Sequence, residues 1–561
     1  MIRLTELRLP IDHDDAALTQ AVADRLGVPV MDISDVTIFR RGHDARRRHR
    51  IMLVYTVDCA VRDEAAVLAA HDGARDIMPA PDTSYRFVVD DGPAMARMAG
   101  FVRPVVIGAG PCGLMAALVL AQMGLRPLVL ERGKVVRERT VDTFALWRKS
   151  ILNPESNVQF GEGGAGTFSD GKLYSQVSDP RHYGRKVLAE FVRAGAPEEI
   201  LYLSRPHIGT FRLVSMVERI RAEIEALGGE YRFGAHVTDF VTQDDGAGGQ
   251  RIAALRLADG DEIAAGHVVL AIGHSARDTF ASLHAAGVDM VAKPFSIGVR
   301  IEHPQSIINT ARYGQPDTVP LLGAADYRLV HHAANGRGVY SFCMCPGGTV
   351  VAATSEVGQV VTNGMSQYSR AERNANAGIV VGVTPERDYP GGPLAGIAFQ
   401  REWERKAFEA GGGAYFAPAQ TVGDFLDGRP STALGDVVPS YRPGVTPTDL
   451  ALCLPEFAVT AMREALPAFE RKIPGFSMRD AIMTGVETRT SSPLRIPRGV
   501  DGQGVNMRGL FPAGEGAGYA GGILSAGIDG IRIAEAVALS LAGRPVDGTM
   551  QRGMTHATDA Q

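Results

Sequence analysis

Three glycines and an acid have the types and spacing needed to bind the phosphates and ribose of a dinucleotide. Gly108, Gly110 and Gly113 form a G-x-G-x-x-G string, and Glu131 follows eighteen residues after the last glycine. In such a string the first glycine permits a tight turn, the second lets a pyrophosphate approach the backbone, and the third lets a helix pack closely on a strand. The acid can bind ribose hydroxyls. The expected contacts of this dinucleotide site also include Pro111, Cys112 and Arg132.

The elements around this string are those that the site requires. Residues 105–107 are an apolar run typical of a buried parallel strand, an apolar helix follows the glycines, and residues 128–130 predict the next strand. The N-terminus of the helix offers free N–H groups and the positive end of its dipole to phosphates. A second G-x-G-x-x-G string at 161–166 follows no apolar strand and precedes no long helix, so we interpret residues 160–173 as a flexible glycine loop.

Two later glycine-rich segments indicate which dinucleotide binds. Residues 266–274 form an apolar strand that ends in a glycine turn, and residues 509–527 combine a short strand, a glycine turn with one acid, and a helix start. In this order they resemble the central and closing motifs of FAD-dependent oxidoreductases of the glutathione-reductase type. The resemblance implies FAD, with the closing turn beside the ribityl chain and the next helix aimed at the flavin O2. The residues implied by it are Val237, Gly273, Gly514, Glu515, Gly522 and Ile523.

Three further segments resemble those of one particular family of FAD-dependent proteins. Residues 160–173, 342–348 (Phe-Cys-Met-Cys-Pro-Gly-Gly) and 362–366 (Thr-Asn-Gly-Met-Ser) are similar to those of a bacterial family of largely uncharacterised FAD-dependent dehydrogenases. That family has a small N-terminal α/β domain ahead of the flavin domain. The resemblance covers nearly the whole chain and implies a fold and a cofactor, but no substrate.

Composition excludes several other classes of protein. The 561 residues carry a formal net charge of −5, so neither a nucleic-acid partner nor an acidic tail is indicated. Five cysteines without a ligand cluster suggest a reducing compartment and no disulfide framework. The N-terminus lacks the basic start and apolar run of a signal peptide. We expect a soluble, cytoplasmic protein with no membrane segment.

The order of expected elements predicts an α/β fold: a Rossmann-type FAD-binding domain, an inserted α+β substrate domain with an antiparallel sheet, and an N-terminal module. The β-α-β-β-α order at the N-terminus suggests that this module is ferredoxin-like. The predicted boundaries are 1–100 for the N-terminal module, 101–290 and 480–545 for the FAD-binding domain, 291–479 for the substrate domain, and 546–561 for a disordered tail.

Polar residues of the expected substrate domain are the candidates for catalysis. Arg300 and Glu302 alternate on one strand, so they face one side and could bind a substrate carboxylate, or form a structural salt bridge. His303 is either an acid/base or a satisfied surface histidine. Cys343 and Cys345 share a strand face and are either a redox pair or small core residues. Further polar candidates near glycine turns are Asn363, Ser366 and Arg489.

Two functions follow from these patterns. The first is an FAD-dependent dehydrogenase or reductase that moves a hydride between flavin N5 and a small organic substrate, with NAD(P)H as one candidate electron partner. The second is a flavoprotein that mainly binds or senses RNA or a protein through the basic run at residues 40–50 of the N-terminal module. Oxidase and reductase chemistry, the substrate and the oligomeric state stay open.

Overall fold

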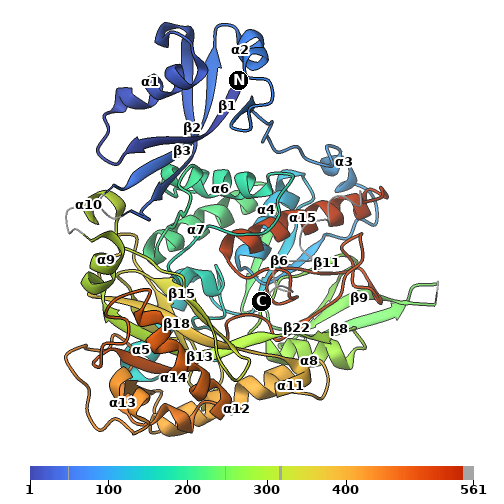
Figure 1. Ribbon diagram of the computed structural model, residues 1–561. Helices are drawn as coiled ribbons and strands as arrows, with labels where there is room; N and C mark the ends of the chain where they lie inside the picture. The colour runs from blue at the N-terminus through green and yellow to red at the C-terminus, as the bar shows by residue number, and fades with distance from the viewer. Residues whose placement is uncertain (48–49, 247, 315–318, 547–561) are drawn as a thin grey trace.

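The computed structural model describes residues 1–47, 50–246, 248–314 and 319–546. The described part of the chain forms six sheets, and three of them organise the fold. Figure 1 shows the N-terminal sheet at one end of the molecule and helices α12 to α14 at the other. The predicted disordered tail at 546–561 falls almost entirely outside the described residues. Among the helices of the described part, none has both the length and the apolar character needed to cross a bilayer.

A five-stranded parallel sheet carries the first glycine turn. Its order is β24 (Leu510–Pro512), β11 (Val268–Leu270), β5 (Val105–Ile107), β6 (Leu128–Glu131) and β7 (Glu230–Phe233). The strands are short, and those at 105–107, 128–131, 268–270 and 510–512 are buried along their length, as apolar runs in a sheet covered on both faces should be. Strand β5 has β6, the next strand in the sequence, on one side and β11, from much later in the sequence, on the other, so the strand order reverses direction at β5. The carboxyl ends of these strands therefore open a crevice, where ligands of α/β sheets bind.

Two helices that begin at this crevice pack against each other. They are α4 (Pro111–Gln122) and α15 (Ile523–Leu541), and they share a core with α6 (Tyr183–Arg193) and α7 (Thr210–Ala226). A Cβ on Gly530 would overlap the carbonyl oxygen of Cys112, so the two helix backbones approach closely only because this residue is glycine. Helix α15 confirms the helix expected from about residue 522 to 541.

A seven-stranded sheet forms the inserted part of the molecule. Its order is β14 (Val330–His332), β15 (Gly338–Cys345), β18 (Asn374–Val383), β13 (Phe295–Pro304), β21 (Ile482–Glu487), β19 (Ala417–Thr421) and β20 (Val445–Pro447). All its pairs are antiparallel except the edge pair of β19 and β20. Strand β21 lies inside this sheet although it follows the predicted boundary at 479, because its partner β13 lies far upstream in the chain.

The N-terminal sheet has the order β2, β3, β1, β4, and all its pairs are antiparallel. Its elements are β1 (Ile2–Pro10), α1 (Asp15–Leu26), β2 (Ile33–Asp44), β3 (Met52–Val61), α2 (Glu64–Ala70) and β4 (Ile77–Pro79). This is the β-α-β-β-α-β order of a ferredoxin-like arrangement. After Pro79 the chain leaves this sheet, and Val89 is buried in the core around α4. The packing of the module thus ends well before the predicted boundary at 100.

The basic run of this module lies at the end of β2 and in the turn after it. In that run Arg46 pairs with Asp44 at 2.5 Å, and the backbone of Arg41 pairs with the segment at 202–204, which joins β2 to the rest of the molecule. Arg48 lies outside the described residues. The described part of the run therefore makes local and interdomain contacts.

The remaining strands form a second four-stranded sheet and two two-stranded sheets, and the remaining helices connect the sheets and cover their faces. The helices are α3 (Gly92–Met95), α5 (Val136–Lys149), α8 (Arg277–Ala285), α9 (Gln305–Tyr313), α10 (Val319–Leu322), α11 (Pro385–Asp388), α12 (Ala395–Ala410), α13 (Val422–Asp427) and α14 (Glu456–Glu470). The strands are β8 (Val237–Asp244), β9 (Gln250–Leu257), β10 (Glu262–Ala264), β12 (Val291–Ala292), β16 (Thr349–Ala352), β17 (Thr362–Met365), β22 (Leu494–Arg495) and β23 (Met507–Arg508).

Candidate cofactor and active site

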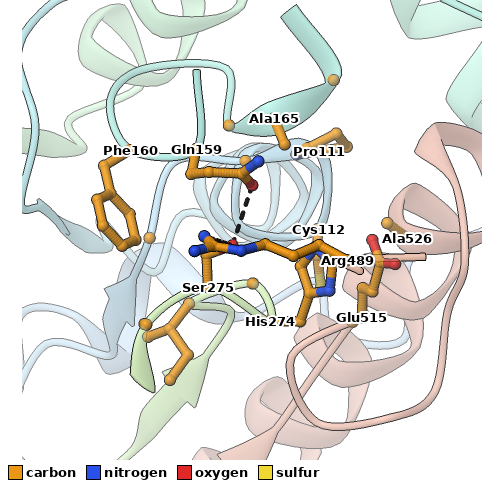
Figure 2. A pocket seen from close by; sticks show the side chains of 18 of the residues that line it. Pro111, Cys112, Gln159, Phe160, Ala165, His274, Ser275, Arg489, Glu515 and Ala526 are labelled. Atoms are coloured by element: carbon orange, nitrogen blue, oxygen red, sulfur yellow. Dashed lines mark hydrogen bonds between the residues drawn. The ribbon is translucent and has the colours of Figure 1, made fainter. Parts of the chain in front are cut away.

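One cavity of about 450 Å³ lies between the carboxyl ends of the five-stranded sheet and the inserted sheet. This volume is within the range of cofactor and small-molecule sites. Figure 2 shows Gln159 and Phe160 on one side of the cavity and Glu515 and Ala526 on the other. Each predicted glycine motif contributes to its wall. The predicted cofactor contacts that line it are Gly108, Gly110, Pro111, Cys112, Glu131, Arg132, Val237, Gly273, Gly514, Glu515, Gly522 and Ile523.

The first glycine turn has the steric reasons that the spacing predicts. Gly108 has a φ of +99°, and a Cβ there would lie 2.5 Å from the carbonyl oxygen of Ala271. Gly113 does not line the cavity, but a Cβ on it would overlap the Gly108 carbonyl oxygen, so it allows α4 to pack on the turn. A Cβ on Gly110 would meet only the Gly164 Cα, at 3.6 Å. Gly110 therefore leaves an open cradle beside the free N–H groups in the first turn of α4.

Glu131 connects three backbone turns around the cavity. Its Oε2 accepts from the Ala109 N–H at 2.8 Å, and its Oε1 accepts from Gly133 at 2.8 Å and Gly161 at 3.0 Å. A carboxylate has about four acceptor positions, so one is left for a ligand hydroxyl. Glu131, which we expect to bind a ribose, therefore also links three backbone segments that surround the cavity.

Arg132 and Val237 lie at the same end of the cavity as Glu131. The Arg132 guanidinium stacks over the Phe160 ring, 4.1 Å from its centroid, and pairs with Glu155 at 3.0 Å and Asp278 at 2.9 Å. Val237 begins β8. These residues form an aromatic and charged rim where the resemblance places an adenine.

The closing glycine turn forms the opposite end of the cavity. The Gly514 N–H donates to Asp529 at 2.7 Å, and Asp529 in turn pairs with Arg498 at 2.6 Å in a buried ion pair. Burial raises the pKa of Glu515 to about 7. Helix α15 begins at Ile523, and Gly521, Gly522 and Ile523 line the cavity, so the unpaired N–H groups of a second helix N-terminus lie at its wall.

These features fit FAD in their chemistry. Two helix N-termini and a side-chain-free cradle suit a pyrophosphate and a flavin carbonyl edge, and a carboxylate with one open acceptor position suits a ribose. All of them open into the same cavity.

The loop at 160–173, which we expected to be flexible, is packed and hydrogen-bonded. Arg139 of α5 is completely buried, and its guanidinium donates to the carbonyl oxygens of Asn157, Val158 and Glu162, each at 2.7 Å. Gly161 is needed there because a Cβ on it would overlap the Arg139 side chain. Sequence reasoning missed Arg139, although an arginine among the residues of a helix that face the core is a detectable signal.

Polar groups from the inserted segment between residues 291 and 490 close the flavin end of the cavity. Cys343, Asn363, Glu487 and Arg489 line it, together with Asp170 and Lys172 of the glycine loop. Asp170 and Lys172 belong to the segment 160–173, which carries the resemblance, but the sequence alone does not mark them as site residues. Other lining residues that were missed are Gln159, His274 and Ser275; Gln159 and Arg489 both bond to the Ser275 hydroxyl, at 3.1 Å each.

Arg300 lies behind this wall, and it organises three residues that line the cavity. It forms a two-pronged ion pair with Glu487, with Nη2 at 2.8 Å from Oε1. It also donates to the Asn363 side chain at 3.1 Å and to the Cys343 carbonyl at 2.8 Å. Burial raises the pKa of Glu487 to about 7, although the charge of Arg300 opposes this shift. Arg300 itself does not line the cavity and is a positioning residue.

Glu302, His303 and Ser366 are not part of the cavity wall. Glu302 shares a face of β13 with Arg300, as the alternation predicts, but its carboxylate accepts from Ser440 and Asn374. The His303 ring is completely buried and its Nε2 donates to the Phe476 carbonyl at 2.7 Å, so it is neither a surface histidine nor placed to act as an acid/base at this cavity. The expected pairing of Arg300 with Glu302 gives way to Arg300 with Glu487 because β21 lies beside β13.

The comparisons with known families agree with this site. A family described as "FAD-dependent protein, C-terminal domain-like" matches residues 294–490, and one described as "FAD binding domain" matches residues 102–156. A domain of unknown function matches residues 1–60. An uncharacterised protein from Clostridium beijerinckii is 45% identical over 541 residues, which are 95% of this chain and 98% of that protein.

Two solved structures resemble this chain at low identity. L-proline dehydrogenase from P. horikoshii is 12% identical, with a TM-score of 0.38, over 79% of this chain and 94% of that one. The halogenase PltM in complex with phloroglucinol and FAD is 11% identical, with a TM-score of 0.37, over 80% of this chain and 72% of that one. At these values neither structure carries its activity over to this chain.

Proposed function

This chain belongs to a family of FAD-dependent proteins, and on that premise we propose that it is an oxidoreductase that moves a hydride between its FAD and a small organic substrate. The observation that carries the proposal is the continuity of the cavity. Its wall runs from the glycine turns of the five-stranded sheet to polar side chains of the inserted sheet. A substrate enclosed by that second wall would meet the end of the cofactor where redox chemistry takes place.

The glycine turns and helix ends of the chain hold the cofactor in this proposal. The N–H groups at the start of α4 and the cradle at Gly110 would hold the pyrophosphate, and the N–H groups at the start of α15 would hold the flavin. When bound, FAD supplies a hydride acceptor or donor at its N5. The protein contributes to the hydride transfer by attracting the charged groups of the cofactor and by excluding water from the cavity.

The polar wall formed by the inserted segment and the glycine loop orients the substrate. Lys172 and Asn363 offer donors to a carboxylate or carbonyl group, and Arg300 fixes the position of Asn363 and Glu487. Glu487 lines the cavity, and a carboxyl group whose pKa burial raises to about 7 can take up or release a proton at neutral pH, so Glu487 is the proposed acid/base. Oxidation of an alcohol or amine needs both a hydride acceptor and a base, because a proton leaves the substrate when the hydride does.

The first test is the visible spectrum of the purified protein under anaerobic conditions, before and after addition of NADPH or NADH. Bleaching of the yellow colour by a nicotinamide supports a reductase, and bleaching only by pools of metabolites supports a dehydrogenase that takes electrons from its own substrate. An enzyme that no nicotinamide and no metabolite pool reduces would contradict the proposal.

A pair of variants tests the role of Glu487. Glu487→Gln should keep FAD but lower the rate of flavin reduction by about 100-fold, the usual contribution of a general acid or base. Glu386→Gln, which changes an exposed acid on α11, is the matched control and should react at the original rate.

A further inference from the structure

Cys343 lies in a distorted part of the inserted sheet. The pairing of β15 with β18 shifts register between Phe342 and Cys345, and Cys343 has a φ of +40°. A left-handed conformation is rare for a non-glycine residue inside a strand, and such strain collects at functional sites. A bulge re-aims a side chain, and Cys343 lines the cavity.

Cys345 lies directly beside Cys343. Its Sγ donates to the Cys343 carbonyl oxygen at 3.3 Å. Cys343 is half-buried, whereas Cys345 and the other three cysteines, Cys59, Cys112 and Cys453, are buried. The described residues hold no group of three or more side chains that could bind a metal ion, so nothing in that part of the chain makes the pair a metal site.

Two cations lie next to this pair of cysteines. Lys172 donates from its ammonium group to the carbonyl of Met344, between the cysteines, and Arg300 donates to the carbonyl of Cys343 at 2.8 Å. A hydrogen bond from the Cys345 side chain, together with the charges of Lys172 and Arg300, holds the pKa of Cys343 well below its usual value. Positive surroundings and partial exposure are the conditions under which a cysteine is a reactive thiolate.

We propose that Cys343 and Cys345 form a dithiol/disulfide pair that exchanges two electrons with the bound FAD. The two thiols lose two electrons and two protons as one S–S bond forms between them, and the FAD gains both electrons and both protons. The reverse reaction breaks that bond and oxidises the cofactor. This inference goes beyond the proposed hydride transfer and rests only on the presence of FAD in the cavity.

The test counts electrons in the holoprotein. Wild-type protein is oxidised with oxidised glutathione, desalted, and titrated anaerobically with dithionite, while its FAD content is measured by release. FAD and the disulfide each take up two electrons. The wild type should therefore take up about four electrons per FAD, and Cys345→Ser about two. After oxidation, two of the five thiols should resist alkylation, and a peptide with the Cys343–Cys345 bond should appear in the mass spectrum.

Cys59→Ala is the matched control, because Cys59 is buried in the N-terminal sheet. It should still take up about four electrons per FAD. Uptake of only two electrons by the wild type, or five free thiols after oxidation, would overturn the inference. The proposed hydride transfer would still stand if a substrate bleached the FAD in both wild type and Cys345→Ser, so the two proposals can fail separately.

Discussion

At the scale of single residues, Gly110 is the position where a side chain would do the most direct harm to cofactor binding. The space in front of it belongs to the cavity, and the backbone across that space is Gly164, 3.6 Å from an added Cβ. We predict that Gly110→Leu folds but does not retain FAD, because its side chain fills the place of the pyrophosphate. The ratio of absorbance at 450 nm to that at 280 nm, with circular dichroism for folding, checks this.

Gly382→Ala serves as the control for the glycine prediction. An added Cβ at Gly382, in β18, meets nothing within 4 Å, so this variant should keep its FAD. Stoichiometric FAD in folded Gly110→Leu would contradict the assignment of the cofactor to this cavity.

His303 leads to a prediction about pH and stability. Burial lowers its pKa from 6.5 to about 4, and its buried Nδ1 has no partner. Between these values the unfolded chain binds a proton that the folded chain does not. The full stability is therefore present above pH 6.5 and is lost as the pH falls towards 4. His303→Gln should reduce this loss by up to about 1.4 kcal/mol per pH unit.

Urea unfolding midpoints at several pH values between 4.5 and 7 measure that loss. His267 and His274 have pKa values lowered to about 4 by burial as well, so the variant should flatten the pH dependence only in part. His284→Gln, at an exposed position of α8, is the control. An identical pH dependence in His303→Gln and wild type would show that the ring titrates normally.

At the scale of elements, α5 supports the glycine loop through one side chain. Arg139 donates to three carbonyls of residues 157–162, where the chain enters the loop, and hydrogen bonds to a charged donor are worth about 1.5–3 kcal/mol each. We predict that Arg139→Met lowers the free energy of unfolding by about 3 kcal/mol or more and weakens FAD binding, because Gly161 of the same loop donates to Glu131. Thermal unfolding and FAD titration check both effects.

The same helix supplies the control for Arg139. Arg137 is exposed on α5 and pairs with Glu218 at the surface, where an ion pair contributes little. Arg137→Met should therefore keep both FAD affinity and stability close to those of the wild type. Equal losses of stability and FAD affinity in the two variants would mean that a change in the helix itself, and not the loss of the Arg139 contacts to the loop, causes them.

The elements also show which features the sequence could predict. The sequence predicts a helix over residues 15–26, and these are the bounds of α1; in the structure Asp14 caps its start by accepting from Ala17, and Gly27 ends it in a left-handed conformation. Both signals are local in the chain. The ion pair of Arg300 with Glu487 depends on β13 and β21 meeting in one sheet across most of the inserted sequence. Periodicity contains no such long-range information, so the cofactor turns were predicted better than the polar wall.

At the scale of the whole molecule, the cavity is where three cores meet. One core lies around α4 and α15, a second lies on the other face of the five-stranded sheet, and the third lies around the inserted sheet. The lining residues come from all three, so FAD should stabilise them together. At a free concentration one hundred times its Kd, a ligand that binds only the folded state adds about 2.7 kcal/mol. Protein stripped of FAD should therefore unfold at a lower temperature, and added FAD should restore it in proportion to the logarithm of its concentration.

Hydrogen exchange can locate this stabilisation. If the cofactor spans the cavity, its removal should weaken protection both in the turn after β5 and at the ends of β15 and β17, which carry Cys343 and Asn363. Protection lost only around β5 would mean that the flavin end does not reach the inserted sheet, and the polar wall would then lie too far from the reacting atoms to act on a substrate. Protection lost on both sides would place Glu487, Lys172 and Cys343 at the cofactor, as the proposed chemistry requires.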